Sequence, residues 1–293
     1  MMENLTENKE WISVHIFYTA HNKFLIEALP GFLEIIKNQF PVHKYFFIRY
    51  WEAGPHIRLR LLVNTNDKEK IKNEIITFFS IYLEKNPSVR NIEKEHFLPN
   101  NTVHFIEYEP EVERYGGGEG ISTAESHFQD SSETVLNLMS SINQNWNLGV
   151  AQGIALQLSY IFLKSVALND DEIKEMLFKM DNSHWKERAR IVSKTENVDI
   201  LFEKQYLKNK EAILERFNAL DGVLDTDEAI DDSPIFHWHR YIKEKDIALN
   251  NSSLTRKRHI IYISYLHMLN NRLGLSNHDE GYISYVLYNS FIN

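Results

Sequence analysis

The stretch YFFIRYWEAGPHIRLRL (Tyr45–Leu61) places basic side chains among residues that would otherwise favour burial. After the break at Ala53–Pro55, the residues His56, Arg58 and Arg60 alternate with aliphatic residues. Successive side chains of a strand point to opposite faces, so one face of this strand is apolar and the other basic. A basic face of this kind is either a solvated sheet surface or a site whose guanidinium forks bind a carboxylate.

Two further segments carry charged side chains that could join such a site. Arg49 lies on the neighbouring strand and joins the basic face only if the register allows it. The segment YEPEVERYGGGEG (Tyr108–Gly120) contains Glu109 and Arg114 beside three consecutive glycines. This segment is either a charged edge that pairs with itself, or a place where Arg114 reaches the arginines while glycine N–H groups approach an anion.

The late segment SYLHMLNNRLGL (Ser264–Leu275) supplies a candidate for proton transfer. His267 and Asn271 are four residues apart, so they share one face of a helix. Most helical histidines are structural, yet histidine is the side chain best suited to move protons near neutral pH. His237 and His239 are two residues apart and point apart on a helix, so we interpret them as packing residues.

Composition excludes several classes of protein. The chain has 293 residues, 43% of them hydrophobic, and a net charge of -9, which argues against general nucleic-acid binding. It has no cysteine, so disulfides, thiolate zinc sites and cysteine nucleophiles are excluded. It shows no phosphate-binding fingerprint and no metal-ligand spacing, so we expect no cofactor and no metal. Without a signal peptide or an apolar span, we expect a soluble cytoplasmic protein.

The first part of the chain is predicted to mix strands and helices. Alternation predicts strands at Trp11–Thr19 and Thr102–Pro110, and a hairpin across Tyr45–Leu61 that turns at Ala53-Gly54-Pro55. Helical spacing predicts Phe24–Phe40, broken or kinked at Pro30-Gly31, and Asn66–Lys85.

The rest of the chain is predicted to be helical. Ser122 followed by Glu125 fits a capping box and predicts a helix start near Ser122. Helical periodicity covers 121–143, 147–166, 170–182, 196–219, 235–249, 255–273 and 277–291. The acidic run Leu220–Pro234 is predicted to be a loop. We therefore expect one α+β domain over residues 1–293, with a small, mostly antiparallel sheet in a mixed part (1–120) packed with a helical part (121–293).

Taken together, three motifs resemble one known family. They are FFIRYWEAGPHIRLRL, YEPEVERYGGGEGISTAESHF followed by DSS, and YLHMLNNRLGL. In this order they are similar to the C-terminal elimination domain of the class I lanthipeptide dehydratases, which also exists as a free-standing protein in thiopeptide and related bacteriocin pathways. The resemblance extends from about Trp11 to the C-terminus.

The resemblance implies a lyase of peptide natural product biosynthesis. In that family a separate domain esterifies serine or threonine of a precursor peptide with glutamate from glutamyl-tRNA. The elimination domain then removes the α-proton and expels glutamate, leaving dehydroalanine or dehydrobutyrine. The implied partners are the ribosomal precursor peptide, with its leader and glutamylated core, and a separate glutamylation-domain protein. Direct contact with nucleic acid is not expected, and a homodimer stays open.

The resemblance also assigns roles to residues. Arg58, Arg60 and Arg114 match the family's essential arginines, which would stabilise the enolate and bind the departing glutamate. His267 matches the essential histidine and would transfer the proton, with a base role favoured because a carboxylate leaving group needs little acid help. A second group is predicted to bind substrate or to orient these residues: Arg49, His56, Glu109, Tyr115, Asn271 and Arg272.

Two other functions stay open for this fold. One is the pyridine synthase of thiopeptide pathways, which joins two dehydroalanines and expels the leader peptide. The other is a non-catalytic scaffold that binds the precursor peptide, for which the sheet could accept an extended strand. Synthases have drifted from the elimination motifs, and a decayed scaffold would be expected to lose His267. The presence of all three motifs therefore favours elimination.

Overall fold

The computed structural model describes residues 8–182, 197–224 and 234–292, and these form two compact units. Unit 1 comprises Met1–Pro110 with Ser131–Asn145, and unit 2 comprises Glu111–Asp130 with Trp146–Asn293. Helix α4 (Gly118–Ile142) contributes its first half to unit 2 and its second half to unit 1. Below, each unit is described by itself.

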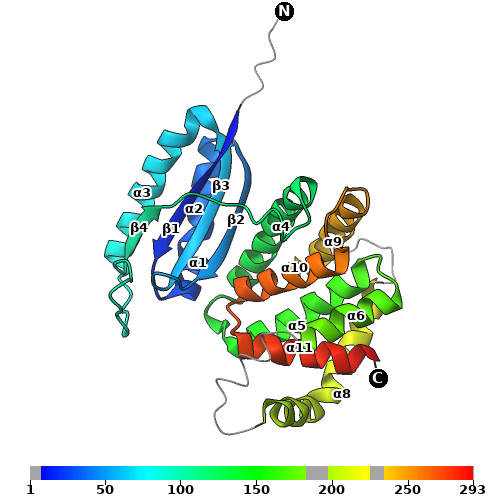
Figure 1. The fold of residues 1–293 in the computed structure, drawn as a ribbon. Coiled ribbons are helices and arrows are strands. Elements are labelled where there is room, and N and C mark those ends of the chain that lie inside the picture. The colour runs from blue at the N-terminus through cyan, green and yellow to red at the C-terminus, as the bar shows by residue number, and fades with distance from the viewer. Residues whose placement is uncertain (1–7, 183–196, 225–233, 293) are drawn as a thin grey trace, which may run out of the picture. The chain divides into compact units, whose positions relative to one another are not determined.

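Unit 1 contains a small antiparallel sheet, as the sequence predicts (Figure 1). Its strands, in the order β2-β3-β1-β4, are β1 (Lys9–Phe17), β2 (Val42–Tyr50), β3 (His56–Asn64) and β4 (Thr102–Phe105). The hairpin of β2 and β3 turns through Ala53 and Gly54, whose φ angles are 60° and 108°. Glycine adopts such angles without steric cost, which explains the sequence break at this position.

Three helices of unit 1 supply the aromatic side of its core. They are α1 (His21–Glu27), α2 (Leu29–Gln39) and α3 (Lys68–Lys85), with a 3-10 turn at Thr65–Asp67. The aliphatic residues Ile57, Leu59 and Leu61 of β3 are completely buried. In the same core the ring of Phe79 lies 4.7 Å from Phe32 and 5.2 Å from Phe24. The apolar face of β3 is therefore a core face, which confirms one half of the predicted alternation.

Two boundaries in unit 1 differ from the prediction. The first helical segment breaks at Ala28 and not at Pro30-Gly31, because Pro30 lies in the first turn of α2, where its missing N–H costs nothing. The last strand ends at Phe105 and not at Pro110, and the segment after it crosses the sheet without strand pairing (Figure 1).

The described part of unit 2 is helical, as predicted. Besides the first half of α4, its helices are α5 (Leu148–Ser165), α6 (Asp170–Asp181), α8 (Val198–Leu224), α9 (Pro234–Asn250), α10 (Arg258–Leu273) and α11 (Asn277–Ile292). Local capping signals fix two of the starts. Asn147 accepts a hydrogen bond from the N–H of Val150 at 3.1 Å, and Asn169 forms a capping box with Glu172.

Two helix boundaries of unit 2 correct the prediction. Helix α4 begins at Gly118, so Ser122 lies inside the helix and is not its N-cap. Gly116 and Gly117, with φ of 84° and 105°, form the turn before it, and regular helix resumes immediately afterwards. The acidic run is also partly helical, because α8 continues to Leu224; residues 225–233 of the predicted loop lie outside the described residues.

Within the described ranges, no helix is both long and apolar enough to cross a membrane.

Candidate functional site

The basic face of β3 lies in a row of cross-strand partners in unit 1. Arg58 pairs with His15 of β1 and Ile48 of β2, and Arg60 pairs with Ser13 and Phe46. Directly paired residues of a sheet point to the same face, so these side chains surround the two arginines. The alternation in the sequence therefore correctly predicts that His56, Arg58 and Arg60 share a face.

Arg58 is held by two neutral groups. Its Nε–H donates to Nε2 of His56 at 3.2 Å, and its Cζ lies 3.5 Å from the centre of the Tyr50 ring. The other ring nitrogen of His56 lies 2.7 Å from the carbonyl oxygen of Gly54. Because Nδ1–H donates to that carbonyl, Nε2 is left as the acceptor for Arg58, and one tautomer serves both contacts.

Burial favours the neutral forms of His15 and His56. It lowers the pKa of His56 to about 4, although the hydrogen bond to Gly54 opposes the shift. It lowers the pKa of His15 to about 3, and the charges of His56, Arg58 and Arg60 add to this effect. The rings of His15 and His56 are stacked with centroids 4.9 Å apart. The face thus carries its positive charge on guanidinium groups.

Arg60 is more deeply placed than Arg58. Arg60 is buried, and its guanidinium lies 4.7 Å from the centre of the Tyr108 ring and 5.5 Å from the centre of the Phe46 ring. Tyr108 comes from the segment that crosses the sheet after β4, and its ring also contacts Trp11 at 5.4 Å. Arginine stacks well on aromatic faces, so this pocket of rings orients Arg60 without neutralising it.

Sequence reasoning missed several residues of this face. Ser13 and His15 of β1 and His104 of β4 share it, since His15 pairs with Arg58 on one side and with His104 on the other. The alternation Trp11, Ser13, His15 in WISVHIF was the available signal, but only the strand order shows that β1 is the neighbour of β3.

Arg49 does not belong to this face. The register pairs Arg49 with Ile57, whose side chain lies in the apolar core. Its Nη1 donates to Oδ1 of Asn22 at 2.7 Å, and its Nη2 lies 3.8 Å from the sulfur of Met139 in α4. A shift of one residue in the pairing register of β2 and β3 would have moved Arg49 to the face of Arg58. The hairpin turn sets this register and therefore decides which face Arg49 occupies.

In unit 2, Arg114 is joined to helix α10. Its Nε–H donates to the hydroxyl of Ser264 at 3.1 Å, and its Nη1 pairs with the Glu111 carboxylate at 3.1 Å. Ser264 and His267 are three residues apart on α10, so they share a helix face. Unit 2 thus places two of the predicted catalytic residues on or beside one face of α10. The pair of Arg114 with Glu111 lies within one segment, as the alternative of a charged edge that pairs with itself predicted.

His267 forms a pair with a buried carboxylate. Its Nδ1 lies 2.8 Å from Oε2 of Glu280 at the start of α11. Burial raises the pKa of Glu280, and the contact with His267 partly offsets the shift. If Nδ1–H donates to Glu280, Nε2 keeps its lone pair and can accept a proton. Glu280 was also missed, because it lies on the helix that follows α10 and meets His267 only in the folded chain.

The remaining predicted residues occupy different environments. Tyr115 and Arg272 are almost completely buried; Nη1 of Arg272 donates to the carbonyl oxygen of Met268 at 2.9 Å, and its guanidinium lies 5.3 Å from the Phe128 ring. Such burial favours packing or orientation over direct substrate contact. Asn271 is half-buried on the face of His267, and Glu109 is exposed.

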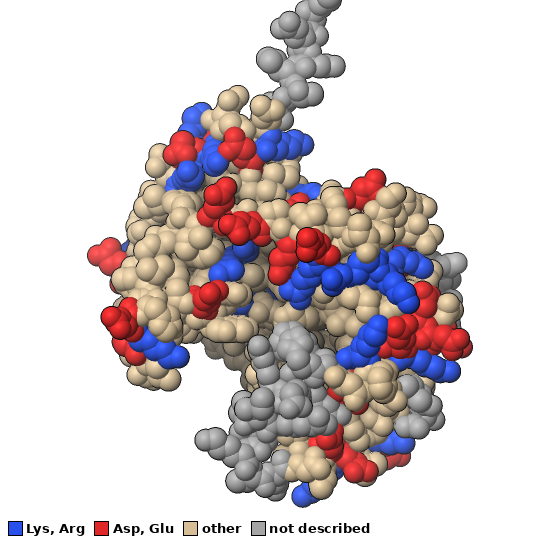
Figure 2. Space-filling model, in the orientation of Figure 1, with Lys and Arg blue, Asp and Glu red and all other residues tan. Residues whose placement is uncertain are grey.

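The described residues contain no cluster of three or more histidines and carboxylates that could hold a metal ion. On the face drawn in Figure 2, acidic and basic side chains both occur, and several basic side chains lie together in one blue band.

Comparison with known proteins identifies the class of protein. Residues 11–291 match the family described as lantibiotic biosynthesis dehydratase, C-terminal, which is nearly the whole sequence. The chain belongs to this family, as its three motifs predicted.

Among the curated proteins, the nisin biosynthesis protein NisB of Lactococcus lactis subsp. lactis is 27% identical over 97% of this chain and 26% of its own length. The subtilin biosynthesis protein SpaB of Bacillus subtilis is 24% identical over 91% of the chain and 27% of its own length. The chain therefore spans about a quarter of the length of these relatives.

Two solved structures share the fold. The pyridine synthase TbtD from thiomuracin biosynthesis aligns with a TM-score of 0.76 and 17% identity, covering 96% of this chain and 97% of that one. The tRNA-dependent lantibiotic dehydratase MibB from Microbispora sp. 107891 aligns with a TM-score of 0.66 and 17% identity, covering 96% of this chain and 28% of that one.

Proposed function

We propose that this chain is a lyase that eliminates glutamate from glutamylated serine or threonine residues of a ribosomal precursor peptide. The family match over residues 11–291 supports this, together with arginines and a histidine at the motif positions. Glutamylation itself would be carried out by residues outside this sequence. The single geometric observation that carries the proposal is the contact of Arg114 with Ser264, one helical turn from His267.

The proposed reaction transfers one proton and shifts two electron pairs. Nε2 of His267 accepts the α-proton, while Glu280 holds the opposite nitrogen. The electrons of the broken Cα–H bond form the second bond between Cα and Cβ. The Cβ–O bond breaks at the same time, and glutamate leaves as a carboxylate with the electron pair of the Cβ–O bond. The products are dehydroalanine or dehydrobutyrine and free glutamate.

The arginines would stabilise the negative charge that appears in this reaction. A guanidinium stays charged at every relevant pH and binds carboxylates with two parallel hydrogen bonds. Arg114 would act near the base, and Arg58 and Arg60 would bind the glutamyl group. The neutral contacts of Arg58 support this role, because His56 and Tyr50 orient the guanidinium without neutralising its charge.

A direct test is to incubate the protein with a precursor peptide that carries glutamylated serine and to follow the peptide mass. We expect loss of one glutamic acid per modified serine, and no change in the same peptide with unmodified serine. A glutamyl peptide that binds but stays intact would contradict the lyase proposal and support the scaffold.

The pyridine synthase is the second candidate, and one observation favours it. The fold aligns more closely with TbtD, at a TM-score of 0.76, than with MibB, at 0.66. A peptide with two dehydroalanines separates the two functions in the same assay. Formation of a macrocycle with release of the leader peptide would indicate the synthase.

A further inference from the structure

A pocket of about 830 Å³ lies beside the hairpin turn of unit 1. One wall is the turn itself, with Trp51, and the other is formed by residues 89–97, with Val89 and Ile92. We call it the hairpin pocket. Its volume lies within the range of ligand sites, and the proposed roles of the arginines and His267 leave it unused.

The hairpin pocket exposes large apolar side chains. Trp51 is 60% exposed, Val89 80% and Ile92 68%. Val89 and Ile92 lie along a connection, residues 86–101, that contains neither helix nor strand. Ordered connections of more than about 12–15 residues are uncommon in compact domains and are usually functional. Clustered exposed apolar groups of this kind typically mark a binding surface.

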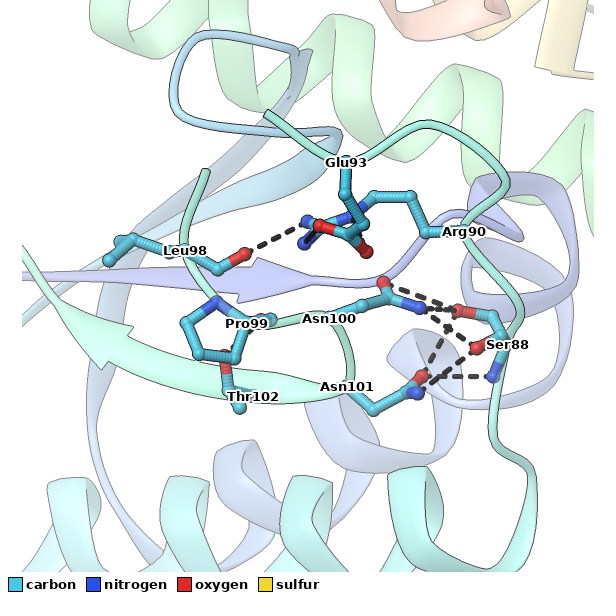
Figure 3. A network of polar contacts seen from close by, with 8 residues as sticks. All are labelled: Ser88, Arg90, Glu93, Leu98, Pro99, Asn100, Asn101 and Thr102. Atoms are coloured by element: carbon cyan, nitrogen blue, oxygen red, sulfur yellow. Dashed lines mark hydrogen bonds and ion pairs between the residues drawn. The ribbon is translucent and has the colours of Figure 1, made fainter. Parts of the chain in front are cut away.

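The wall formed by this connection is held by a polar network (Figure 3). The Ser88 N–H donates to Oδ1 of Asn101 at 2.9 Å, and the amides of Asn100 and Asn101 donate back to the Ser88 carbonyl oxygen at 2.8 and 3.0 Å. Arg90 pairs with Glu93 and donates to the carbonyl oxygen of Leu98 at 2.8 Å. This network preorganises the wall before any ligand binds.

The two walls are also fixed to each other. The Leu98 N–H donates to the carbonyl oxygen of Ala53 in the hairpin turn at 2.8 Å. Gly54 faces Arg90 so closely that a Cβ at this position would lie 2.8 Å from Nη1. The pocket is therefore a built feature of the unit, because its shape depends on a glycine and on several polar contacts that are partly buried.

Tyr50 connects the hairpin pocket to the proposed glutamate site. Its ring lines the pocket and stacks on Trp51, with centroids 5.5 Å apart and planes at 16°. The guanidinium of Arg58 stacks on this same ring. A ligand that reached Arg58 could therefore place a neighbouring group against Trp51.

We propose that the hairpin pocket binds an apolar side chain, preferably aromatic, of the substrate peptide close to its glutamylated residue. This inference rests on the proposed function of the arginine face. An extended peptide advances about 3.3 Å per residue, so the side chain would come from about one to three residues away. The shared Tyr50 ring favours the substrate peptide over a second copy of the chain as the occupant.

The test uses synthetic heptapeptides with a central glutamylated serine, in which phenylalanine replaces alanine at one of the three positions on either side. We expect one position at which phenylalanine raises kcat/KM about tenfold, the size of one good aromatic contact. Trp51→Ala should remove this preference and leave the all-alanine peptide unchanged, while Trp51→Phe should keep most of it. Ile81→Ala, at an exposed residue of α3, is the matched control and should change neither rate.

Failure of the pocket can be told apart from failure of the proposed function. The same peptides with unmodified serine report binding alone, by fluorescence anisotropy of an attached dye. Suppose that no peptide is converted but that phenylalanine tightens binding only when Trp51 is present. This result would support the pocket proposal and contradict the proposed lyase activity.

Two outcomes would overturn the pocket proposal. In one, glutamate is eliminated at equal rates from all the peptides by both proteins. In the other, Trp51→Ala leaves the peptide preference intact and converts a dimer to a monomer in sedimentation, which would assign the surface to a second copy.

Discussion

In unit 1, Arg58 contacts a neutral histidine and a tyrosine ring, whereas in unit 2 Arg114 and His267 each contact a carboxylate. Neutral contacts orient a guanidinium and leave its attraction for an external carboxylate intact. The Glu280 carboxylate can instead fix one tautomer of His267, which suits a group that gains and loses a proton, while Glu111 partly balances the charge of Arg114. This comparison supports the proposal that the sheet face of unit 1 binds an anion and that helix α10 of unit 2 carries the proton-transfer group.

The largest expected effect separates the proton-transfer role from structure. His267→Ala should lower the rate of elimination about 10²–10⁴-fold, because general base catalysis contributes on that order. Mass spectrometry should show unreacted glutamyl peptide. His237→Ala on α9 is the control and should keep the wild-type rate. Unchanged turnover in the His267 variant would remove this residue from the mechanism.

The next effect tests the anion-binding role of unit 1. Arg58→Ala should reduce kcat/KM about 10²–10³-fold, the usual cost of removing one donor from developing negative charge. Arg58→Lys keeps the charge but loses the fork and the flat surface that stacks on Tyr50, so only part of the rate should return. Full recovery with lysine would show that the charge alone is sufficient.

A smaller effect tests whether neutral contacts position Arg58. His56→Ala should lower kcat/KM about tenfold, because a lost hydrogen bond to a charged group costs about 1.5–3 kcal/mol, part of which relaxation recovers. His56→Gln offers an acceptor near Nε2 and should restore most of the rate. If glutamine is as poor as alanine, the acceptor role assigned to His56 is wrong.

Arg49 provides the contrast within the same sheet. Because it lies on the core side and bonds to Asn22, Arg49→Ala should leave kcat/KM per folded molecule unchanged. The free energy of unfolding should fall by about 1–3 kcal/mol, since the buried Arg49 side chain loses its packing contacts and its hydrogen bond to Asn22. Urea titration measures this change. A large loss of activity without loss of stability would return Arg49 to the site.

The last prediction concerns pH and the buried histidines of unit 1. His15 and His56 have pKa values of about 3 and 4, below the ordinary value of about 6.5. Between these values the unfolded chain binds protons that the native chain does not, so stability falls as pH falls from about 6.5 towards 4. Each histidine should contribute about 1.4 kcal/mol per pH unit.

The free energy of unfolding, measured by urea titration at pH 7.0 and at pH 5.5, tests this prediction. Most carboxylates titrate below this pH range, so they contribute little to the difference. His56→Gln should show a smaller loss of stability between the two pH values than the wild type. An equal loss in both proteins would mean that His56 is not buried in its neutral form.

Local patterns were sufficient to predict most elements but not their exact limits. The capping signal at Asn169 and the alternation in β3 are short-range, so the sequence carries them directly. The starts of α2 and α4 were misplaced because Pro30 and Gly118 are tolerated in the first turn of a helix. Proline and glycine disrupt the interior of a helix but are tolerated in its first turn, so they do not mark where a helix begins.

The sequence by itself determined the family, the α+β class and the identity of the arginine-bearing strand. Motif order and side-chain alternation can be read directly from the order of residues, without knowing which residues meet in the fold. Tertiary structure alone decided that Arg49 faces the core, that His15 and His104 lie in one row beside Arg58, and that Glu280 contacts His267. The physical reason is that register, strand order and helix packing are set by contacts between residues far apart in sequence, which no local pattern encodes.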